Sequence, residues 1–345
     1  MSGARLKDVA ERAGVSIKTV SNVVRGAARV AGPTRERVLA AIDELGYRPH
    51  ASARHLRTGR SGVIALAVPE LVAPYFAELA TCVIAAAKES GQTVLIEVTD
   101  GDPAEELRIA CGLSDPLIDG VLLSPLGLDQ AALAARERRV PLVLLGERDY
   151  EVPADHVLID NVAAARDATR HLIGLGRRRI GVVGWQHGER TTATAQQRMQ
   201  GHREALAEAG LAYDPALAPA VGAYTRAGGA AAMRELRALP QPPDAVFCFT
   251  DMLASGAMRV AHDEGLAIPD DLAVVGFDDI QEARYMVPSL TSVAPDKQEL
   301  ARLAVKALLA RIEGQAEAPP TTLLAGYDLA PRESTALGPG GRPQD

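Results

Sequence analysis

Three side chains near the amino terminus share one side of a short helical segment. Ile17, Lys18 and Asn22 alternate there with Val20 and Val23, which form the opposite, apolar side. If the valines face a core, the remaining groups are left to meet base edges in a major groove. This stretch therefore predicts a helix that reads double-stranded DNA.

Four further residues could hold the DNA phosphates, namely Thr19, Ser21, Arg25 and Arg29. The net charge of −7 is unevenly distributed, because residues 1–60 hold 12 Lys/Arg against 5 Asp/Glu and the remainder holds 25 against 39. A basic head on an acidic body favours contact with a polyanion. Taken singly, these basic residues would also suit a solvated helix face, so the motif spacing carries the prediction.

The elements that would position these side chains are three short helices with one small apolar core. Ala10 is small enough to let two helices cross, and Gly14 supplies a tight turn, which is a helix-turn-helix spacing. The expected helices are Leu6–Ala13, Ser16–Val24 and Thr34–Leu45, with Ser16 and Thr34 as N-caps.

From Val63 onward, short β-branched runs alternate with Ala-rich helical stretches, which is typical of parallel βαβ units in an α/β fold. The runs are continuously apolar and therefore predict strands buried on both faces. That many units favours two similar lobes with a ligand cleft between them. The expected strands are Val63–Val68, Thr93–Val98, Gly120–Ser124, Leu142–Leu145, His156–Ile159, Ile180–Gly184, Ala245–Phe249 and Leu272–Gly276.

The domain boundaries follow from these patterns. We expect a head over 1–47, a hinge or linker over 48–61, a body over 62–337 and a Gly/Pro-rich, disordered tail over 338–345. Within the body, we expect lobe 1 at about 62–160 and 292–324, and lobe 2 at about 161–291 and 325–337.

The sequence offers no catalytic, metal or cofactor motif. Asp278 and Asp279 are adjacent, so in a strand their side chains would diverge rather than form a facing acid/base pair. Gly174-x-Gly176 lacks the third glycine of a phosphate loop, and the seven histidines show no ligand-like pairing. Cys82, Cys111 and Cys248 are odd in number and lie in apolar runs, which predicts inert core thiols in a reducing compartment.

The first residues, Met1 to Lys7, contain no apolar run, and no stretch reaches the roughly 20 apolar residues of a membrane-spanning helix. We therefore expect a cytoplasmic, nucleoid-associated protein without a membrane partner. An exported solute-binding protein would share the body fold. It would need an export signal, however, and would have no use for a basic head.

The head resembles that of the lactose/galactose repressor family, also called the LacI/GalR family. The resemblance rests on the helix-turn-helix stretch, on Val-Ala-Gly-Pro-Thr-Arg-Glu-Arg-Val at 30–38 and on Gly-Tyr-Arg-Pro at 46–49, and it extends over residues 4–335. It implies that Ile17, Lys18 and Asn22 choose the operator. It also implies a hinge helix that wedges Leu56 into the minor groove, with Ala53 and Arg57 nearby. The alternative for Leu56 is a contact within a solvated linker.

The body resembles the same family in blocks that include Thr250–Ala257, Val274–Ile280 and Pro288–Val293. The resemblance implies a periplasmic-binding-protein-like body that takes a sugar-like effector between two lobes. It assigns the effector to Arg198, Asp278 and the aromatic residues Tyr75, Phe76 and Tyr224, together with Thr250. The alternatives are a surface arginine at 198, an N-cap or interlobe salt bridge at 278, and core packing for the aromatic residues.

Three departures from the family pattern affect the body. Thr250 stands where many members have Asn, and Gly146 stands where a member has a carboxylate. Both differences weaken the case for assigning any one member's sugar to this chain. Pro331 interrupts an apolar run, so the last strand should end early. The resulting expectation is a homodimeric, allosteric transcription regulator, most simply a repressor, that binds a palindromic operator and is not an enzyme.

Overall fold

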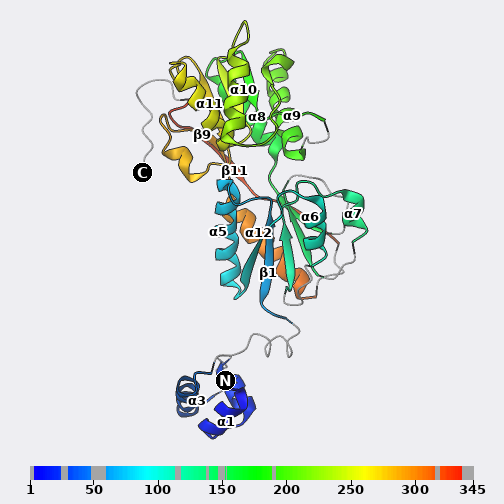
Figure 1. Ribbon diagram of the computed structural model, residues 1–345, viewed down its shortest axis with the longest axis vertical. Helices are drawn as coiled ribbons and strands as arrows, with labels where there is room; N and C mark the ends of the chain where they lie inside the picture. The colour runs from blue at the N-terminus through cyan, green and yellow to red at the C-terminus, as the bar shows by residue number, and fades with distance from the viewer. Residues whose placement is uncertain are drawn as a thin grey trace. The chain divides into compact units, whose positions relative to one another are not determined.

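The structure is a computed structural model that describes residues 4–24, 30–47, 60–112, 118–136, 140–146, 152, 154–188, 192–314 and 319–335. The chain divides into two compact units, Met1–Gly62 and Val63–Asp345 (Figure 1). The first unit is helical in its described part, and the second combines helices with two sheets.

The first unit contains three helices, α1 (Leu6–Ala13), α2 (Ile17–Val24) and α3 (Gly32–Glu44). Gly14 ends α1 with a φ of 65°, a conformation that costs glycine little, and this confirms the expected tight turn. One valine from each helix, Val9, Val20 and Val38, is fully buried at the centre of their common core.

The two expected N-caps have different outcomes. The Ser16 hydroxyl accepts a hydrogen bond from the Thr19 amide at 3.1 Å, as a cap of α2 should. Thr34 is not an N-cap, because α3 begins earlier, after Ala31, with Pro33 in its first turn. Proline favours this position because its fixed φ suits a helix start and its missing N–H is not needed there.

The first sheet of the second unit is entirely parallel, in the order β10-β5-β4-β3-β1-β2. Buried residues of α5 and α12 pack against one face of the sheet, and those of α6 and α7 pack against the other (Figure 1). The strands are β1 (Val63–Val68), β2 (Thr93–Val98), β3 (Gly120–Leu123), β4 (Leu142–Leu145), β5 (Asp155–Leu158) and β10 (Thr322–Leu324). The helices are α5 (Pro74–Glu89), α6 (Pro103–Ala110), α7 (Gln130–Ala134) and α12 (Lys297–Ile312).

The second sheet has the order β11-β9-β8-β7-β6 and is parallel except for β11. Its helices pack as two pairs, α8 with α9 and α10 with α11. The strands are β6 (Ile180–Val183), β7 (Ala245–Cys248), β8 (Ala273–Phe277), β9 (Thr291–Pro295) and β11 (Tyr327–Ala330). The α-helices are α8 (Asn161–Gly174), α9 (Ala193–Glu208), α10 (Arg226–Arg237) and α11 (Asp251–Asp263), and the 3₁₀ turns are η2 (Pro215–Leu217) and η3 (Gln281–Arg284).

The eight expected strands are present, with ends that differ by one residue or agree. Strand β11 ends at Ala330, immediately before Pro331, so the expected early end is confirmed. Strand β9 belongs to the second sheet, so the chain crosses to the first lobe at α12, a few residues after the approximate boundary at 291/292.

The three cysteines are free, but only Cys248 is buried, and Cys82 and Cys111 are half-buried. The expectation of three core thiols is therefore correct for one of them. Burial raises the pKa of the Cys248 thiol and, more weakly, that of Cys82. In the described ranges, no helix is both long and apolar enough to cross a membrane.

Candidate DNA interface and effector site

The three residues expected to read bases lie on α2, away from its buried side. Val20 and Val23 face the core, whereas Ile17, at 49% exposure, and Lys18 are exposed and Asn22 is partly exposed. Lys18 makes no ion pair within the described part of the head. An exposed apolar side chain beside an available ammonium group suits contact with base edges.

The residues expected to hold phosphates are only partly described. The Thr19 hydroxyl is 2.9 Å from the hydroxyl of Ser16, so it also takes part in the start of α2. Ser21 is partly exposed on the same helix. Arg25 and Arg29, and the hinge residues Ala53, Leu56 and Arg57, lie outside the described residues.

Arg198 of α9 lies inside the second lobe, with only 5% exposure. Its Nε donates to Asn161 Oδ1 at 2.7 Å, its Nη1 donates to the carbonyl oxygen of Phe249, and its guanidinium carbon is 3.4 Å from the centre of the Phe277 ring. The alternative of a surface arginine is therefore wrong. The fixed and stacked guanidinium is held at the carboxyl ends of β7 and β8.

Asn161, which the sequence reasoning missed, fixes one edge of this guanidinium. It is the first residue of α8, and Asp160 caps that helix by accepting from the Ala163 amide at 2.9 Å. Gly201 of α9 lies so close to Val162 of α8 that a Cβ atom would overlap its carbonyl oxygen. Close approach of the two helices therefore brings Arg198 to Asn161.

Asp278 follows β8 directly and is buried. Asp278 and Asp279 have positive φ values of 108° and 44°, so they form a turn rather than a continuation of the strand. The Asp278 amide donates to the carbonyl oxygen of Val293 at 2.9 Å. Such left-handed conformations are uncommon for residues other than glycine and persist where the surroundings hold them.

Asp251, at the start of α11, stabilises the turn that contains Asp278 and Asp279. Its carboxylate accepts from the Ser292 hydroxyl at 2.7 Å and from the Ile280 amide at 2.9 Å. Burial, and then the charge of Asp278, raise the pKa of Asp251. Gly276 leaves room for this carboxylate, since a Cβ atom there would overlap it. The Thr250–Ala257 block includes Asp251, but its sequence pattern does not indicate that Asp251 supports this turn.

Asp279 forms ion pairs with two arginines of the same lobe. Its carboxylate is 2.5 Å from the Arg332 guanidinium and 3.5 Å from that of Arg284. These contacts fix the turn to the carboxyl-terminal segment of the lobe.

Tyr224 and Thr250 lie at neighbouring strand ends of the same lobe. The Tyr224 hydroxyl donates to the carbonyl oxygen of Gly184, which follows β6, at 2.9 Å. The Thr250 hydroxyl accepts from the Leu253 amide at 3.2 Å and caps α11, so it has a structural role. Its proton remains able to donate to a second group.

Tyr75 and Phe76 come from the other lobe, in the first turn of α5. Their rings meet edge to face, with centroids 5.3 Å apart, and both are partly buried. Beside them, Lys297 Nζ is 2.6 Å from Glu78 Oε2 and 3.0 Å from the carbonyl oxygen of Asp279. Glu78 also accepts from the Gln281 amide at 2.7 Å. The start of α5 is thereby tied to the turn that carries Asp278.

The expected ligand residues therefore meet at one end of the two sheets. Arg198, Asp278, Tyr224 and Thr250 share the carboxyl edge of the second sheet, and Tyr75 is linked to it through Lys297. No group of three His, Cys, Asp or Glu residues that could hold a metal ion occurs among the residues that the structure describes.

Comparison with known protein families identifies both parts of the chain. The model for bacterial regulatory proteins of the lacI family matches residues 5–50, and the model for a periplasmic binding protein-like domain matches residues 169–335. A chain with this head and this body is a DNA-binding transcription regulator with a ligand-binding fold.

Individual relatives agree with both matches. The transcriptional repressor CytR of Escherichia coli strain K12 is 35% identical over 316 residues, or 91% of each chain. The transcriptional regulator CelR of Thermobifida fusca is 38% identical over 339 residues, or 95% of this chain and 97% of the relative. The protein therefore belongs to the lacI family.

Solved structures extend the comparison to the fold. A CelR–cellobiose complex is 36% identical, has a TM-score of 0.70 and matches 96% of this chain and 99% of its own. A lac repressor dimer bound to operator and the anti-inducer ONPF is 26% identical, has a TM-score of 0.84 and matches 97% and 100% of the two chains. The two-lobed α/β body with an amino-terminal helix-turn-helix head is thus confirmed.

Proposed function

We propose that this protein is a homodimeric repressor that binds a palindromic operator and changes its affinity when a small, sugar-like effector binds between the lobes. The relatives named above include repressors, a lac repressor dimer on its operator and a regulator with bound cellobiose. In this proposal Ile17, Lys18 and Asn22 read bases, and Thr19, Ser21, Arg25 and Arg29 hold phosphates.

The observation that carries the effector proposal is the environment of Arg198. A buried guanidinium that is fixed by Asn161, Phe249 and Phe277 is preorganised to donate paired hydrogen bonds. The buried carboxylate of Asp278 would accept from hydroxyl groups, and the rings of Tyr75, Phe76 and Tyr224 would offer apolar faces. Paired polar groups beside aromatic faces suit a polyol ring.

The contacts between the lobes supply a means of coupling. Glu78 and Lys297 join α5 and α12 of the first lobe to the backbone of Asp279 and Gln281. A ligand that binds Asp278 would act on this same turn and would favour one arrangement of the lobes over another. Because binding free energies are linked, the effector must then change operator affinity as the operator changes effector affinity.

An apolar outer surface of the first lobe supports the homodimer. Val72 is 78% exposed, Leu71 and Ile84 are each 43% exposed, and Leu95 and Val98 are also exposed on β2, an edge strand. Exposed apolar groups on and near an edge strand are typical of an interaction surface. We propose that a second copy of the chain covers them.

We further propose that residues 48–61 form the hinge, with Leu56 in the minor groove and Ala53 and Arg57 beside it. As a DNA-bound regulator, the protein would act in the cytoplasm at the nucleoid. No catalytic role is proposed, since the Asp251 and Asp279 carboxylates are engaged in holding the turn and the relatives are transcription regulators.

The proposal is tested by mixing the purified protein with fragmented DNA from its source, then recovering and sequencing the retained fragments, with and without a panel of sugars. The expected result is enrichment of one short palindrome and its release by one sugar. Retention of DNA without an enriched palindrome, with or without cell extract, would contradict the proposal.

A further inference from the structure

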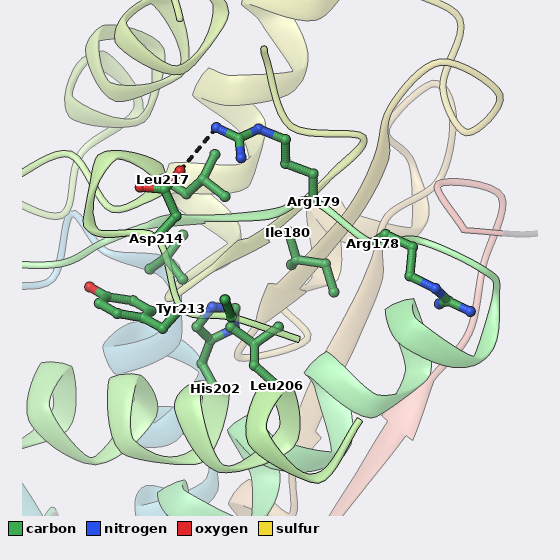
Figure 2. Close-up of a pocket in the computed structure, with 10 residues that line it drawn as sticks. Arg178, Arg179, Ile180, His202, Leu206, Tyr213, Asp214 and Leu217 are labelled. Carbon is green, nitrogen blue, oxygen red and sulfur yellow. Dashed lines mark hydrogen bonds and ion pairs between the residues drawn. The ribbon is translucent and has the colours of Figure 1, made fainter. Parts of the chain in front are cut away.

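The second lobe contains a cavity of about 140 Å³ at the beginning of β6 (Figure 2). Aliphatic side chains from β6, α9 and η2 form much of its lining, including Ile180, Leu206 and Leu217. Strand β6 starts at this cavity and ends near Gly184, where Tyr224 binds. The cavity is therefore at the opposite end of the strand from the proposed effector site.

His202 provides a hydrogen-bonding group inside the cavity. Its side chain is almost completely buried, with 1% exposure, and its Nδ1 is 3.1 Å from the Thr169 hydroxyl. Within the described part of the chain, Nε2 has no hydrogen-bond partner. His202 lines the cavity, and Nε2 is the ring nitrogen that the bond to Thr169 leaves available. Figure 2 shows the imidazole rising from α9 toward the loop that carries Tyr213 and Leu217.

The charged groups at the cavity are engaged with other protein groups. Arg179 forms an ion pair with Asp214 at 3.1 Å and donates to the carbonyl oxygen of Gln241 at 2.6 Å. Arg178 donates to the carbonyl oxygens of Ile173 and Arg177, each at 3.0 Å. Burial and the neighbouring Arg203 lower the pKa of His202 to about 3, so the imidazole is neutral at ordinary pH. Arg179 is thus paired with Asp214, and the guanidinium of Arg178 points away from the other lining residues (Figure 2), so neither charge favours an anion inside the cavity.

The volume of the cavity sets the size of a ligand. An engineered apolar cavity of about 150 Å³ is large enough to bind benzene. A single ring therefore fits this space, whereas a disaccharide does not. A neutral hydrogen-bonding nitrogen beside the aliphatic side chains of Ile180, Leu206 and Leu217 suits a ring with one polar substituent.

We propose that this cavity is a second ligand site, which takes a small, neutral, single-ring molecule with one hydroxyl or ring N–H group. The ring would lie on Ile180, Leu206 and Leu217, and its polar group would bond to Nε2 of His202. This inference is independent of the proposed effector site.

Calorimetric titration of the full-length protein with phenol, toluene and inorganic phosphate tests the proposal. We expect saturable binding of phenol, with an affinity at least about tenfold above that of toluene, and no binding of phosphate. An absence of saturable phenol binding, which would leave water alone as the occupant, overturns the proposal. Binding of phosphate as tight as that of phenol would overturn it as well.

Two pairs of variants locate the bound phenol. Ala212 is exposed at the rim of the cavity, so Ala212→Phe should fill the space and weaken phenol binding at least about tenfold. Ala216→Phe places the same ring at an exposed position of the neighbouring turn and should change nothing. In His202→Phe, phenol should lose its advantage over toluene, whereas His262→Phe, at an exposed position of α11, should bind phenol as the wild type does. Unchanged phenol affinity in Ala212→Phe would refute the assignment, even if His202→Phe failed to fold.

Discussion

At the residue scale, the surroundings of Arg198 fix its side chain in one orientation suited to binding a ligand. Its planar guanidinium is stacked on Phe277 and fixed at one edge by Asn161, so little freedom remains to be lost when a ligand binds. A lysine at this position would keep the charge, but its single nitrogen could not reproduce both the stacking and the forked donors. Arg198→Lys therefore tests the geometry of the guanidinium more specifically than Arg198→Ala does, because it keeps the positive charge.

Lys18 carries a prediction about base choice. If its ammonium group contacts a base edge, Lys18→Ala should reduce discrimination at one operator position by about 1–3 kcal/mol. Competition binding with operators substituted at single positions measures this change. Lys7→Ala is the matched control, because Lys7 lies on α1 and is paired with Glu11 at 3.6 Å. Unchanged discrimination in Lys18→Ala would remove Lys18 from the base-reading set.

Single residues also show what could be predicted from the sequence. The resemblance assigned Arg198 and Asp278 to the effector, and both lie buried at the carboxyl edge of the second sheet. Asn161 and Asp251 were missed because their importance depends on partners far along the chain, Arg198 in one case and Ser292 in the other. No local pattern records such a pairing.

At the scale of elements, the strands that were predicted are those with continuous apolar runs. Strand β9 was missed because it contains Thr291, Ser292 and Pro295, and its polar groups are satisfied by tertiary contacts such as the one with Asp251. Strands β10 and β11 are edge strands with partly exposed residues, so they lack the apolar run that identified the others.

Asp155 joins three elements of the first lobe. At the start of β5, its carboxylate accepts from the Arg311 guanidinium of α12 at 2.7 Å and from the Thr321 amide before β10 at 2.8 Å. Burial alone would raise its pKa, but the bonds from Arg311 and Thr321 outweigh burial and lower it. Because the folded-state pKa is below the unfolded value, this stabilisation exists above the unfolded pKa and is lost as pH falls through the folded pKa.

Asp155→Asn should therefore lower the free energy of unfolding at pH 7 by about 3 kcal/mol, because it leaves Arg311 without its charged partner. The difference from the wild type should shrink as pH falls below about 4, the usual range of an aspartate pKa. Urea unfolding, followed by circular dichroism at pH 7 and at a pH below about 4, measures this difference in the free energy of unfolding. Asp263→Asn, on the surface of α11, is the control and should change little. A difference that did not depend on pH would contradict this role of Asp155.

The exposed surface of α5 and β2 carries a prediction about assembly. Ile84→Asp should weaken the dimer by at least about tenfold, because it places a charge in an apolar interface. The position is exposed in the single chain, so folding should be preserved. Sedimentation at several protein concentrations measures the association. Ala207→Asp, at an exposed position of α9, is the control for added charge. A dimer unaffected by Ile84→Asp would place the interface elsewhere.

At the scale of the whole molecule, we propose that a ligand bound in the body changes the affinity of the head for operator DNA. Such control requires that the effector bind two states of the protein with different affinity, and a coupling of 1–3 kcal/mol, or about 5–150-fold, is usual for allosteric proteins. The same coupling free energy must appear whether the effector or the operator concentration is varied.

The most direct test measures operator affinity with and without the releasing sugar in the wild type, Arg198→Lys and Arg203→Lys. Arg203 is exposed on the same helix and stacks on Tyr213, so its exchange is the matched control. We expect all three proteins to bind the operator alike without sugar, and the sugar to weaken binding in the wild type and Arg203→Lys but not in Arg198→Lys. An undiminished sugar response in Arg198→Lys, or a loss of operator binding without sugar, would contradict the claim.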